Sequence, residues 1–262
     1  MAAEALFSVS GNVATITLNR PKRGNSLTPG MSQIIIQSLK TVESDPTIGV
    51  VVLTGNGKYF CTGMDLGPDA QAKINDGIKN GDDSMFELWE SFRNCTKPII
   101  AKVNGPVMGG GIGLLFLTDI RIVSSKAYLW FAEVKRGIAP ALISAYIVPQ
   151  IGQFLALNWM MTGKRIPVKR AYDLGIISEV VEPEQLNEAT DKMIKELLGN
   201  GPQAMKWVKE LVKHEVSNGH ESNKKKAQEI FGKMMKSPEA MHGISSFIQR
   251  KKPDWSSFRS KL

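Results

Sequence analysis

Short apolar blocks alternate with polar, glycine-rich blocks along the first two thirds of the chain. Residues 6–10 and 13–19 alternate between apolar and polar on either side of Gly11-Asn12, a pattern that predicts a β-hairpin. Two runs rich in β-branched residues, at 50–53 and 98–103, predict buried strands. The chain therefore starts as a sheet-forming sequence.

Helices are predicted between these strands. Thr28 followed by Pro29 is typical of an N-cap and a first helical position, and it predicts a helix that runs to about residue 43. Phe86, Trp89 and Phe92 recur at helical spacing. Such a stripe indicates core packing or, as the less common alternative, one wall of a pocket for an acyl tail.

The later part of the chain keeps this alternation and then loses it. Strands are predicted at 128–131 and 177–181, and helices at 144–163 and 168–175. The fold class predicted by this alternation is α/β, a sheet with crossover helices. Beyond Pro183 only amphipathic helices are predicted, for example at 204–212 and 226–235.

Two of the predicted strands run directly into glycine-rich loops. Gly109-Gly110-Gly111 joins the strand at 98–103 to an apolar helix, and Gly63-Met64-Asp65 follows the strand at 50–53. Glycines let the backbone approach a ligand, and the first N–H groups of a helix have no partner within it. The two junctions can therefore supply two converging donors to a developing negative charge. Close packing and ordinary turns remain the alternative uses of these glycines.

The glycine run does not match common nucleotide-binding motifs. Leu114 and Phe116 stand where G-x-G-x-x-G needs its last glycine, and no Lys-Ser or Lys-Thr pair follows as in a phosphate loop. Lys102 and Asp119 bracket fewer than the roughly 20 apolar residues that a membrane span requires. We expect neither a nucleotide site of these kinds nor a membrane segment here.

The composition sets further bounds. The chain has 262 residues, 42% of them hydrophobic, enough for one large domain or a domain with an appendage. Cys61 and Cys95, with no secretory signal expected ahead of them, predict free thiols in a reducing compartment. The histidines have no Cys or carboxylate at metal-ligand spacing, so no metal site is predicted; they are His214, His220 and His242.

Charge and the last residues bear on partners and location. The formal net charge is +8, but basic residues cluster only at 224–226 and 250–252. Such clusters suit solvated helix faces or a phosphorylated cofactor as well as nucleic acid, which is not the expected partner. Ser260-Lys261-Leu262 is a peroxisomal address when it stands at a free C-terminus, and it predicts binding to the peroxisomal import receptor.

With both glycine junctions in view, the chain resembles the crotonase superfamily, the enoyl-CoA hydratases and isomerases, over nearly its whole length. The matching segments are NRPKRGNSL, VVLTGNGKYFCTGMDL, KPIIAKVNGPVMGGGIGL, TDIRI, FAEVKRGIAP, MTGKRI, AYDLGIISEVV and FIQRKKPDW. The resemblance implies an α/β fold built as a crotonase-like spiral of ββα units over residues 1–195. It further implies a C-terminal helical region, 196–262, used in homotrimers that often pair into hexamers, and an acyl-CoA substrate that carries the only cofactor, coenzyme A.

The resemblance also assigns site residues. It places the backbone N–H groups of Met64 and Gly110 on the thioester oxygen as an oxyanion hole, and each such donor can be worth about 2.7–4 kcal/mol. It implies four contacts to CoA, namely Lys22 and Arg23 in the first loop, and Phe247 and Arg250 from a neighbouring subunit's helix. Arg250 stands where a lysine is usual.

One departure from the family pattern bears on the reaction. Hydratases of the family carry a glutamate two residues after the third glycine and a second one twenty residues further on. Here the first position is Gly113 and the second is Glu133. One carboxylate suffices to move a double bond from the 3- to the 2-position, so Glu133 is predicted to be the acid/base of an enoyl-CoA isomerase of fatty-acid oxidation. A second isomerase subgroup is not matched, because its glutamate position holds Pro140 and Ala141.

Three alternatives remain open at this stage. Glu133 could instead form a surface salt bridge with Lys135 or Arg136. The enzyme could be a hydratase that takes its second acid from residues 69–83 or from Glu87. The chain could also be a catalytically silent binder of acyl-CoA or RNA, which salt-dependent binding of nucleic acid without turnover would indicate.

Overall fold

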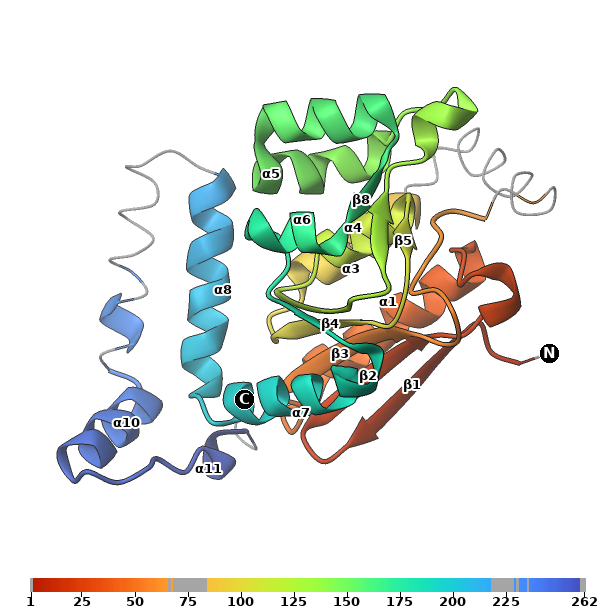
Figure 1. Ribbon diagram of the computed structural model, residues 1–262. Coiled ribbons are helices and arrows are strands. Elements are labelled where there is room, and N and C mark those ends of the chain that lie inside the picture. Colours follow the sequence, from red (N-terminus) through yellow and green to blue (C-terminus); the bar gives the residue numbers. More distant parts are fainter. Residues whose placement is uncertain are drawn as a thin grey trace.

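The computed structural model describes residues 2–65, 67, 84–217, 229, 231–234 and 236–259 (Figure 1). A six-stranded sheet forms its centre, in the order β1-β2-β3-β4-β6-β9. The strands are β1 (Ala5–Ser10), β2 (Val13–Leu18), β3 (Val50–Gly55), β4 (Ile99–Val103), β6 (Ile120–Ser124) and β9 (Glu179–Val181). The predicted hairpin is confirmed, since β1 and β2 pair antiparallel, and every other pair in this sheet is parallel.

A second, smaller sheet consists of β5 (Val107–Met108), β7 (Tyr128–Trp130) and β8 (Arg165–Pro167), in that order. The chain passes from β4 to β5, through a helix to β6, and on to β7, so consecutive strands alternate between the two sheets. A single parallel bridge joins Cys61 to Val107 of β5, and a second one joins Leu27 to Met64. The prediction of a strand at 128–131 is confirmed, whereas β5 and β8 were not predicted.

The helices in the described ranges follow the predicted order; the helix predicted at 226–235 falls partly on residues that the structure does not describe. Thr28 is the N-cap of the first helix, since its hydroxyl accepts the Met31 N–H at 3.0 Å, which confirms the cap prediction. The helices are α1 (Pro29–Ser44), α3 (Ser84–Asn94), α4 (Gly110–Phe116), α5 (Ala141–Thr162), α6 (Val168–Asp173), α7 (Leu186–Leu198), α8 (Pro202–Ser217), α10 (Pro238–Ile248) and α11 (Ser256–Arg259). Short 3-10 turns are η1 (Pro21–Arg23), η2 (Glu133–Arg136) and η3 (Pro183–Gln185).

The two faces of the central sheet pack against different helices. Along β3, Val51 and Leu53 join the main apolar core, which also holds buried residues of α1, α3 and α4. Val50 points to the other face, where it packs in a second cluster with Leu186 of α7. Because side chains alternate along a strand, this division follows directly from the β-branched run at 50–53.

The stripe predicted on α3 is only partly right. Trp89 and Phe92 are buried, but Phe86 is 47% exposed and Leu88 is buried in its place. The buried side of the helix therefore includes Leu88, Trp89 and Phe92, and Phe86 lies outside it.

Arg121 fixes the end of α4 against its surroundings. Its buried guanidinium donates to the carbonyl oxygens of Leu115 (3.0 Å) and Phe116 (3.1 Å) in the last turn of the helix, where carbonyls lack the N–H partner four residues on that a helix interior provides. It also donates to Ile176 O (2.8 Å) and to Gln150 Oε1 (2.6 Å). Burial lowers the pKa of Arg121 to about 10. This one side chain connects α4 to α5 and to the turn before β9, so the glycines that begin α4 are held in place from its far end.

Helix α5 has the length and apolar composition of a membrane span, with 22 residues and a mean hydropathy of 1.3. It is not one continuous helix, because Gly152 has φ 74° and ψ 165°, which are not helical values, and interrupts it. The chain changes direction between the two halves, 141–151 and 153–162 (Figure 1). At 1.5 Å per residue, each half is about 16 Å long, roughly half of what a bilayer core requires.

Candidate active site

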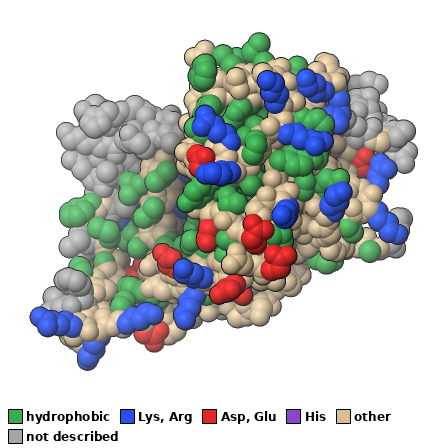
Figure 2. Space-filling view, in the orientation of Figure 1, with side chains coloured by type: hydrophobic (Ala, Val, Ile, Leu, Met, Phe, Trp, Pro, Cys, Tyr) green, Lys and Arg blue, Asp and Glu red, His purple; other side chains and the backbone are tan. Residues whose placement is uncertain are grey.

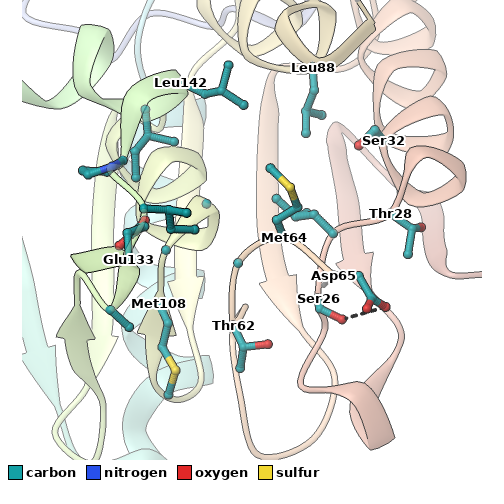
Figure 3. Close-up of a pocket in the computed structure, with 18 of the residues that line it drawn as sticks. Ser26, Thr28, Ser32, Thr62, Met64, Asp65, Leu88, Met108, Glu133 and Leu142 are labelled. Atoms are coloured by element: carbon teal, nitrogen blue, oxygen red, sulfur yellow. Dashed lines mark hydrogen bonds between the residues drawn. The ribbon is translucent and has the colours of Figure 1, made fainter. Parts of the chain in front are cut away.

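A cavity of about 750 Å³ opens between the glycine junctions, α1, α3, η2 and the start of α5. Figure 3 shows Glu133 and Met64 on opposite sides of this cavity, with Leu88 and Leu142 together at one end. The residues that line it come from segments far apart in the sequence, including the loop after β2 and both glycine junctions. The structure thus brings both predicted junctions to one place.

The first junction presents the Met64 N–H. Leu27 N–H donates to Gly63 O at 2.7 Å, and Asp65 N–H donates to Leu27 O at 2.8 Å. Met64 lies between these two bonded groups, and in an extended segment alternate N–H groups point to opposite sides. In the described part of the chain its N–H has no acceptor. Met64 is among the residues that line the cavity.

The second junction presents the Gly110 N–H. Gly109 has φ 51°, a left-handed conformation that favours glycine, and Gly110 is the first residue of α4. The Gly110 N–H therefore has no partner within the helix, and none is found among the other described residues. Helix α4 has only seven residues, so we attribute the donor character to the N–H itself and not to a helix dipole.

The two junctions are in close contact. A Cβ atom placed on Gly63 would lie 3.0 Å from Gly110 N, and one placed on Gly110 would lie 3.6 Å from Met64 N. Gly111 is needed for packing, since a Cβ there would lie 2.6 Å from Cys61 O. Close packing and donor presentation, which the sequence left as alternatives, are therefore both properties of this glycine run.

Glu133 begins η2, and its side chain reaches the second junction. A Cβ placed on Gly109 would lie 3.4 Å from Glu133 Oε1. The Oε2 atom is buried and has no hydrogen-bond partner among the described residues. Burial raises the pKa of this carboxyl above its ordinary value. Among the described residues Glu133 forms no salt bridge, and Arg136 donates instead to Ala132 O at 3.1 Å, so the alternative of a surface salt bridge with Lys135 or Arg136 is wrong.

Asp65 fixes the turn that carries Met64. Its carboxylate accepts from Arg20 Nη2 (2.7 Å), Ser26 Oγ (3.3 Å) and Gly67 N (2.9 Å), and Arg23 Nη2 lies 3.5 Å away. The bond from Gly67 closes the turn that follows Asp65. The ion pair with Arg20 was not predicted, since no sequence pattern connects two residues that are 45 positions apart. These bonds keep the pKa of Asp65 low, although burial acts in the opposite direction.

Asp65→Ala should lower the free energy of unfolding by about 2–3 kcal/mol, because it removes charge-assisted bonds and leaves the half-buried Arg20 without this partner. It should also reduce kcat by roughly tenfold or more, because a small displacement of Met64 misplaces its N–H. Urea denaturation and steady-state kinetics measure the two effects.

Asp173→Ala is the matched control for Asp65→Ala. Asp173 pairs with Lys169 at 2.9 Å on an exposed turn of α6, and an exposed pair of this kind contributes only about 0.5 kcal/mol. Equal losses of stability in the two variants would contradict the role given to Asp65.

Position 113 is closed to a larger side chain. A Cβ placed on Gly113 would lie 2.4 Å from Ile143 Cγ2 and 3.0 Å from Trp89 Cζ3. The glycine therefore does not open extra space for substrate. The alternative that Glu87 supplies the second acid is also wrong. The exposed carboxylate of Glu87 pairs with Lys40 at 3.3 Å, and Glu87 does not line the cavity. Residues 69–83 lie outside the described residues.

The predicted CoA contacts fall into two groups. Lys22 and Arg23 of η1 line the cavity, and Arg23 also approaches Asp65. Arg250 is exposed, follows α10 and does not line the cavity of its own chain. The side chain of Phe247 lies outside the described residues. The structure therefore brings together five of the seven predicted site residues, namely Lys22, Arg23, Met64, Gly110 and Glu133.

Comparison with known proteins decides the family. The sequence model described as enoyl-CoA hydratase/isomerase matches residues 8–258. The chain belongs to this family. An enoyl-CoA hydratase of Alternaria alternata is 32% identical over 239 residues, which are 90% of this chain and 78% of that protein. The enoyl-CoA hydratase EchA19 of Mycobacterium tuberculosis is 31% identical over 255 residues, 96% of each chain.

Solved structures of the enoyl-CoA hydratase/isomerase family share the fold. An enoyl-CoA hydratase subunit I from Geobacillus kaustophilus superposes with a TM-score of 0.89 at 30% identity, over 96% of this chain and 97% of that one. The predicted crotonase-like α/β fold is confirmed. As a member of the enoyl-CoA hydratase/isomerase family, the protein is an acyl-CoA enzyme.

Proposed function

We propose that this family member converts 3-enoyl-CoA to 2-enoyl-CoA, with Glu133 as its single acid/base. The observation that carries the proposal is the environment of Glu133. In the part of the chain that the structure describes, its Oε2 is buried without a hydrogen-bond partner, in a cavity that it shares with two backbone donors without acceptors. The position from which hydratases supply a second carboxylate is Gly113, which Ile143 and Trp89 enclose.

The proposed chemistry needs one proton carrier and one anion site. Glu133 removes a proton from C2, which is acidic because the resulting charge moves onto the thioester oxygen. The N–H groups of Met64 and Gly110 bind that oxygen. Glu133 then returns the proton to C4, where the electrons of the C3–C4 double bond form the new C–H bond. The electrons held on the thioester enolate form the C2–C3 double bond at the same time. Substrate and product are therefore isomers, and no atom is gained or lost. Lys22 and Arg23 bind CoA in this proposal, with Phe247 and Arg250 added by a neighbouring subunit.

A paired assay on the purified protein tests the proposal. Double-bond migration of a 3-enoyl-CoA should proceed with a kcat at least about tenfold above that for water addition to the matched 2-enoyl-CoA, as one positioned proton carrier permits. Hydration that is faster than double-bond migration would favour the hydratase alternative, which agrees with the names of the two relatives. Turnover of neither substrate would favour a catalytically silent binder.

The pH dependence of kcat/KM should report the raised pKa of the Glu133 carboxyl. The carboxyl must be ionised to take a proton, so activity is lost as the pH falls through its pKa. Because burial raises this pKa, the acid limb should have its midpoint above the ordinary value of 4.5. A midpoint at or below the ordinary value would contradict the buried base.

The same pKa shift has a consequence for stability. Between 4.5 and the raised pKa, the folded protein holds a proton that the unfolded chain has released. Stability should therefore fall as the pH rises through this window, and Glu133→Gln should flatten that dependence. Thermal unfolding at several pH values measures it.

We propose in addition that the chain forms a homotrimer or hexamer through its C-terminal helices and α5. Figure 2 shows apolar side chains on α5 and beside α8. The exposed fractions are 80% for Phe154, 68% for Met161, and 59% for both Val208 and Val212. Apolar exposure of this extent is typical of an interface. Light scattering should give three or six times the mass of the chain, and a monomer would contradict it.

A peroxisomal location is the proposal that Ser260-Lys261-Leu262 supports if Leu262 carries the free carboxylate. These residues lie outside the described part of the structure. A fluorescent protein fused ahead of residue 1 should enter peroxisomes, and deletion of the last three residues should leave it in the cytosol. Equal distribution of both fusions would contradict import through this tripeptide.

A further inference from the structure

Two apolar side chains occupy the space in front of Gly113, and the proposed function does not require them. Ile143 comes from the first turn of α5 and Trp89 from α3, and both also line the cavity. We infer that this pair, called here the apolar plug (Ile143 and Trp89), determines the reaction by keeping water and any second acid away from the substrate. The inference rests on the proposed function and names the residues that enforce it.

Position 113 is well placed to act on the same substrate atoms as Glu133. Gly113 lies in the first turn of α4, which begins at Gly110 directly after its N-cap, Gly109. Glu133 Oε1 lies beside Gly109, and the side chains that a Cβ on Gly113 would meet, Ile143 and Trp89, line the same cavity as Glu133. An acidic side chain at position 113 would therefore need the space of Ile143 and Trp89 to reach the cavity of Glu133, where it could hold a water molecule.

The plug fills this region with fixed atoms. Ile143 is 3% exposed and Trp89 is 4% exposed, so neither side chain has solvent to move into. Ile143 is β-branched in a helix, which restricts it to essentially one rotamer. Trp89 packs near Tyr146 of α5, with ring centroids 6.4 Å apart, and the Tyr146 hydroxyl donates to Glu90 Oε1 at 2.7 Å. The contacts between α3 and α5 thus hold both members in place.

The plug offers water too few partners. An ordered water in a protein needs two to four polar contacts, as a general estimate. The only polar side-chain atom in the plug is Trp89 Nε1, which is buried and has no partner within the described ranges of the chain. A single donor without an acceptor does not orient a water for attack at C3. The 2-enoyl product, which is the substrate of a hydratase, therefore leaves the site without being hydrated.

Opening the plug should produce hydration. Ile143→Ala removes the atoms that lie closest to position 113, and Gly113→Glu/Ile143→Ala then supplies a carboxylate in the space released. We expect the double variant to hydrate 2-enoyl-CoA roughly 10²-fold faster than the natural protein, the lower end of what a positioned acid/base contributes. Gly113→Glu alone should gain no hydration and should melt at a lower temperature, because its Cβ overlaps Ile143.

Ile147→Ala is the matched control. Ile147 is fully buried one turn further along α5 and does not line the cavity, so this variant loosens the core without opening the site. It should leave hydration at the level of the natural protein. A folded double variant, judged by circular dichroism, that hydrates no faster than Ile147→Ala would overturn the inference.

Two further measurements keep the test decisive. If the double variant does not fold, the single variant Ile143→Ser replaces it, because it both opens the space and adds a polar group. Hydration about tenfold faster than in the natural protein would support the role of the plug, and no gain would overturn it. Isomerisation of 3-enoyl-CoA by the natural protein is measured in parallel. Its absence would refute the proposed function, whereas the plug is judged only on the gain of hydration.

Discussion

Glu133→Gln should lower kcat for isomerisation of 3-enoyl-CoA by about 10²–10⁴-fold, the range that a positioned acid/base contributes. Glutamine has nearly the same shape as glutamate but does not take up or return a proton. The affinity for acyl-CoA should stay within about threefold, because the oxyanion donors and the CoA contacts lie on other residues. Steady-state kinetics and titration with a non-reacting acyl-CoA measure the two quantities.

Glu87→Gln is the control for this variant. Glu87 is also a helix-associated glutamate, but it pairs with Lys40 outside the cavity. Its replacement should leave isomerisation unchanged within about twofold, since an exposed ion pair contributes little. Activity retained in Glu133→Gln, or an equal loss in both variants, would remove Glu133 from the mechanism.

Replacement of the Met64 N–H by an ester oxygen should lower kcat by about 10²–10³-fold, the cost of removing one oxyanion-hole donor. The α-hydroxy analogue of methionine, introduced by nonsense suppression, makes this change without altering the side chain. The effect should appear in kcat more than in KM, because the charge on the thioester oxygen develops only as the proton leaves C2.

Met31 provides a control with the same analogue. Its N–H donates to Thr28 Oγ1 at the start of α1 and does not line the cavity. The ester there should cost about 1 kcal/mol of stability through the lost cap but should leave kcat unchanged. A similar kcat in the two ester variants would contradict the oxyanion hole.

Local sequence patterns predicted the elements that depend on neighbouring residues. Thr28 and Pro29 predicted the start of α1, and Gly11-Asn12 predicted the turn of the hairpin, since caps and tight turns are determined within a few residues. The glycine run likewise predicted a strand-to-helix junction. Resemblance to the family predicted which residues of these segments form one site. The structure brings three of them, Met64, Gly110 and Glu133, to one cavity.

Features that depend on distant residues were not predictable in the same way. The strands β5 and β8 have two and three residues, too few to show an alternating pattern. The contact between Gly113 and Ile143 joins residues thirty positions apart, so the sequence showed a missing glutamate but not what fills its place. The exposure of Phe86 has the same origin, since helical spacing gives a face but not the neighbour that covers it.

The path of one proton tests the central claim most directly. A 3-enoyl-CoA that carries deuterium at both C2 positions is converted in ordinary water under single-turnover conditions, and the product is analysed by mass spectrometry and NMR. Because Glu133 Oε2 is buried, the deuteron that it removes should be returned in part to C4 before it exchanges with solvent. Deuterium at C4 of the 2-enoyl-CoA is the predicted result. A product whose C4 gains only solvent hydrogen, even at the earliest times, would contradict a single sequestered carboxylate as the carrier.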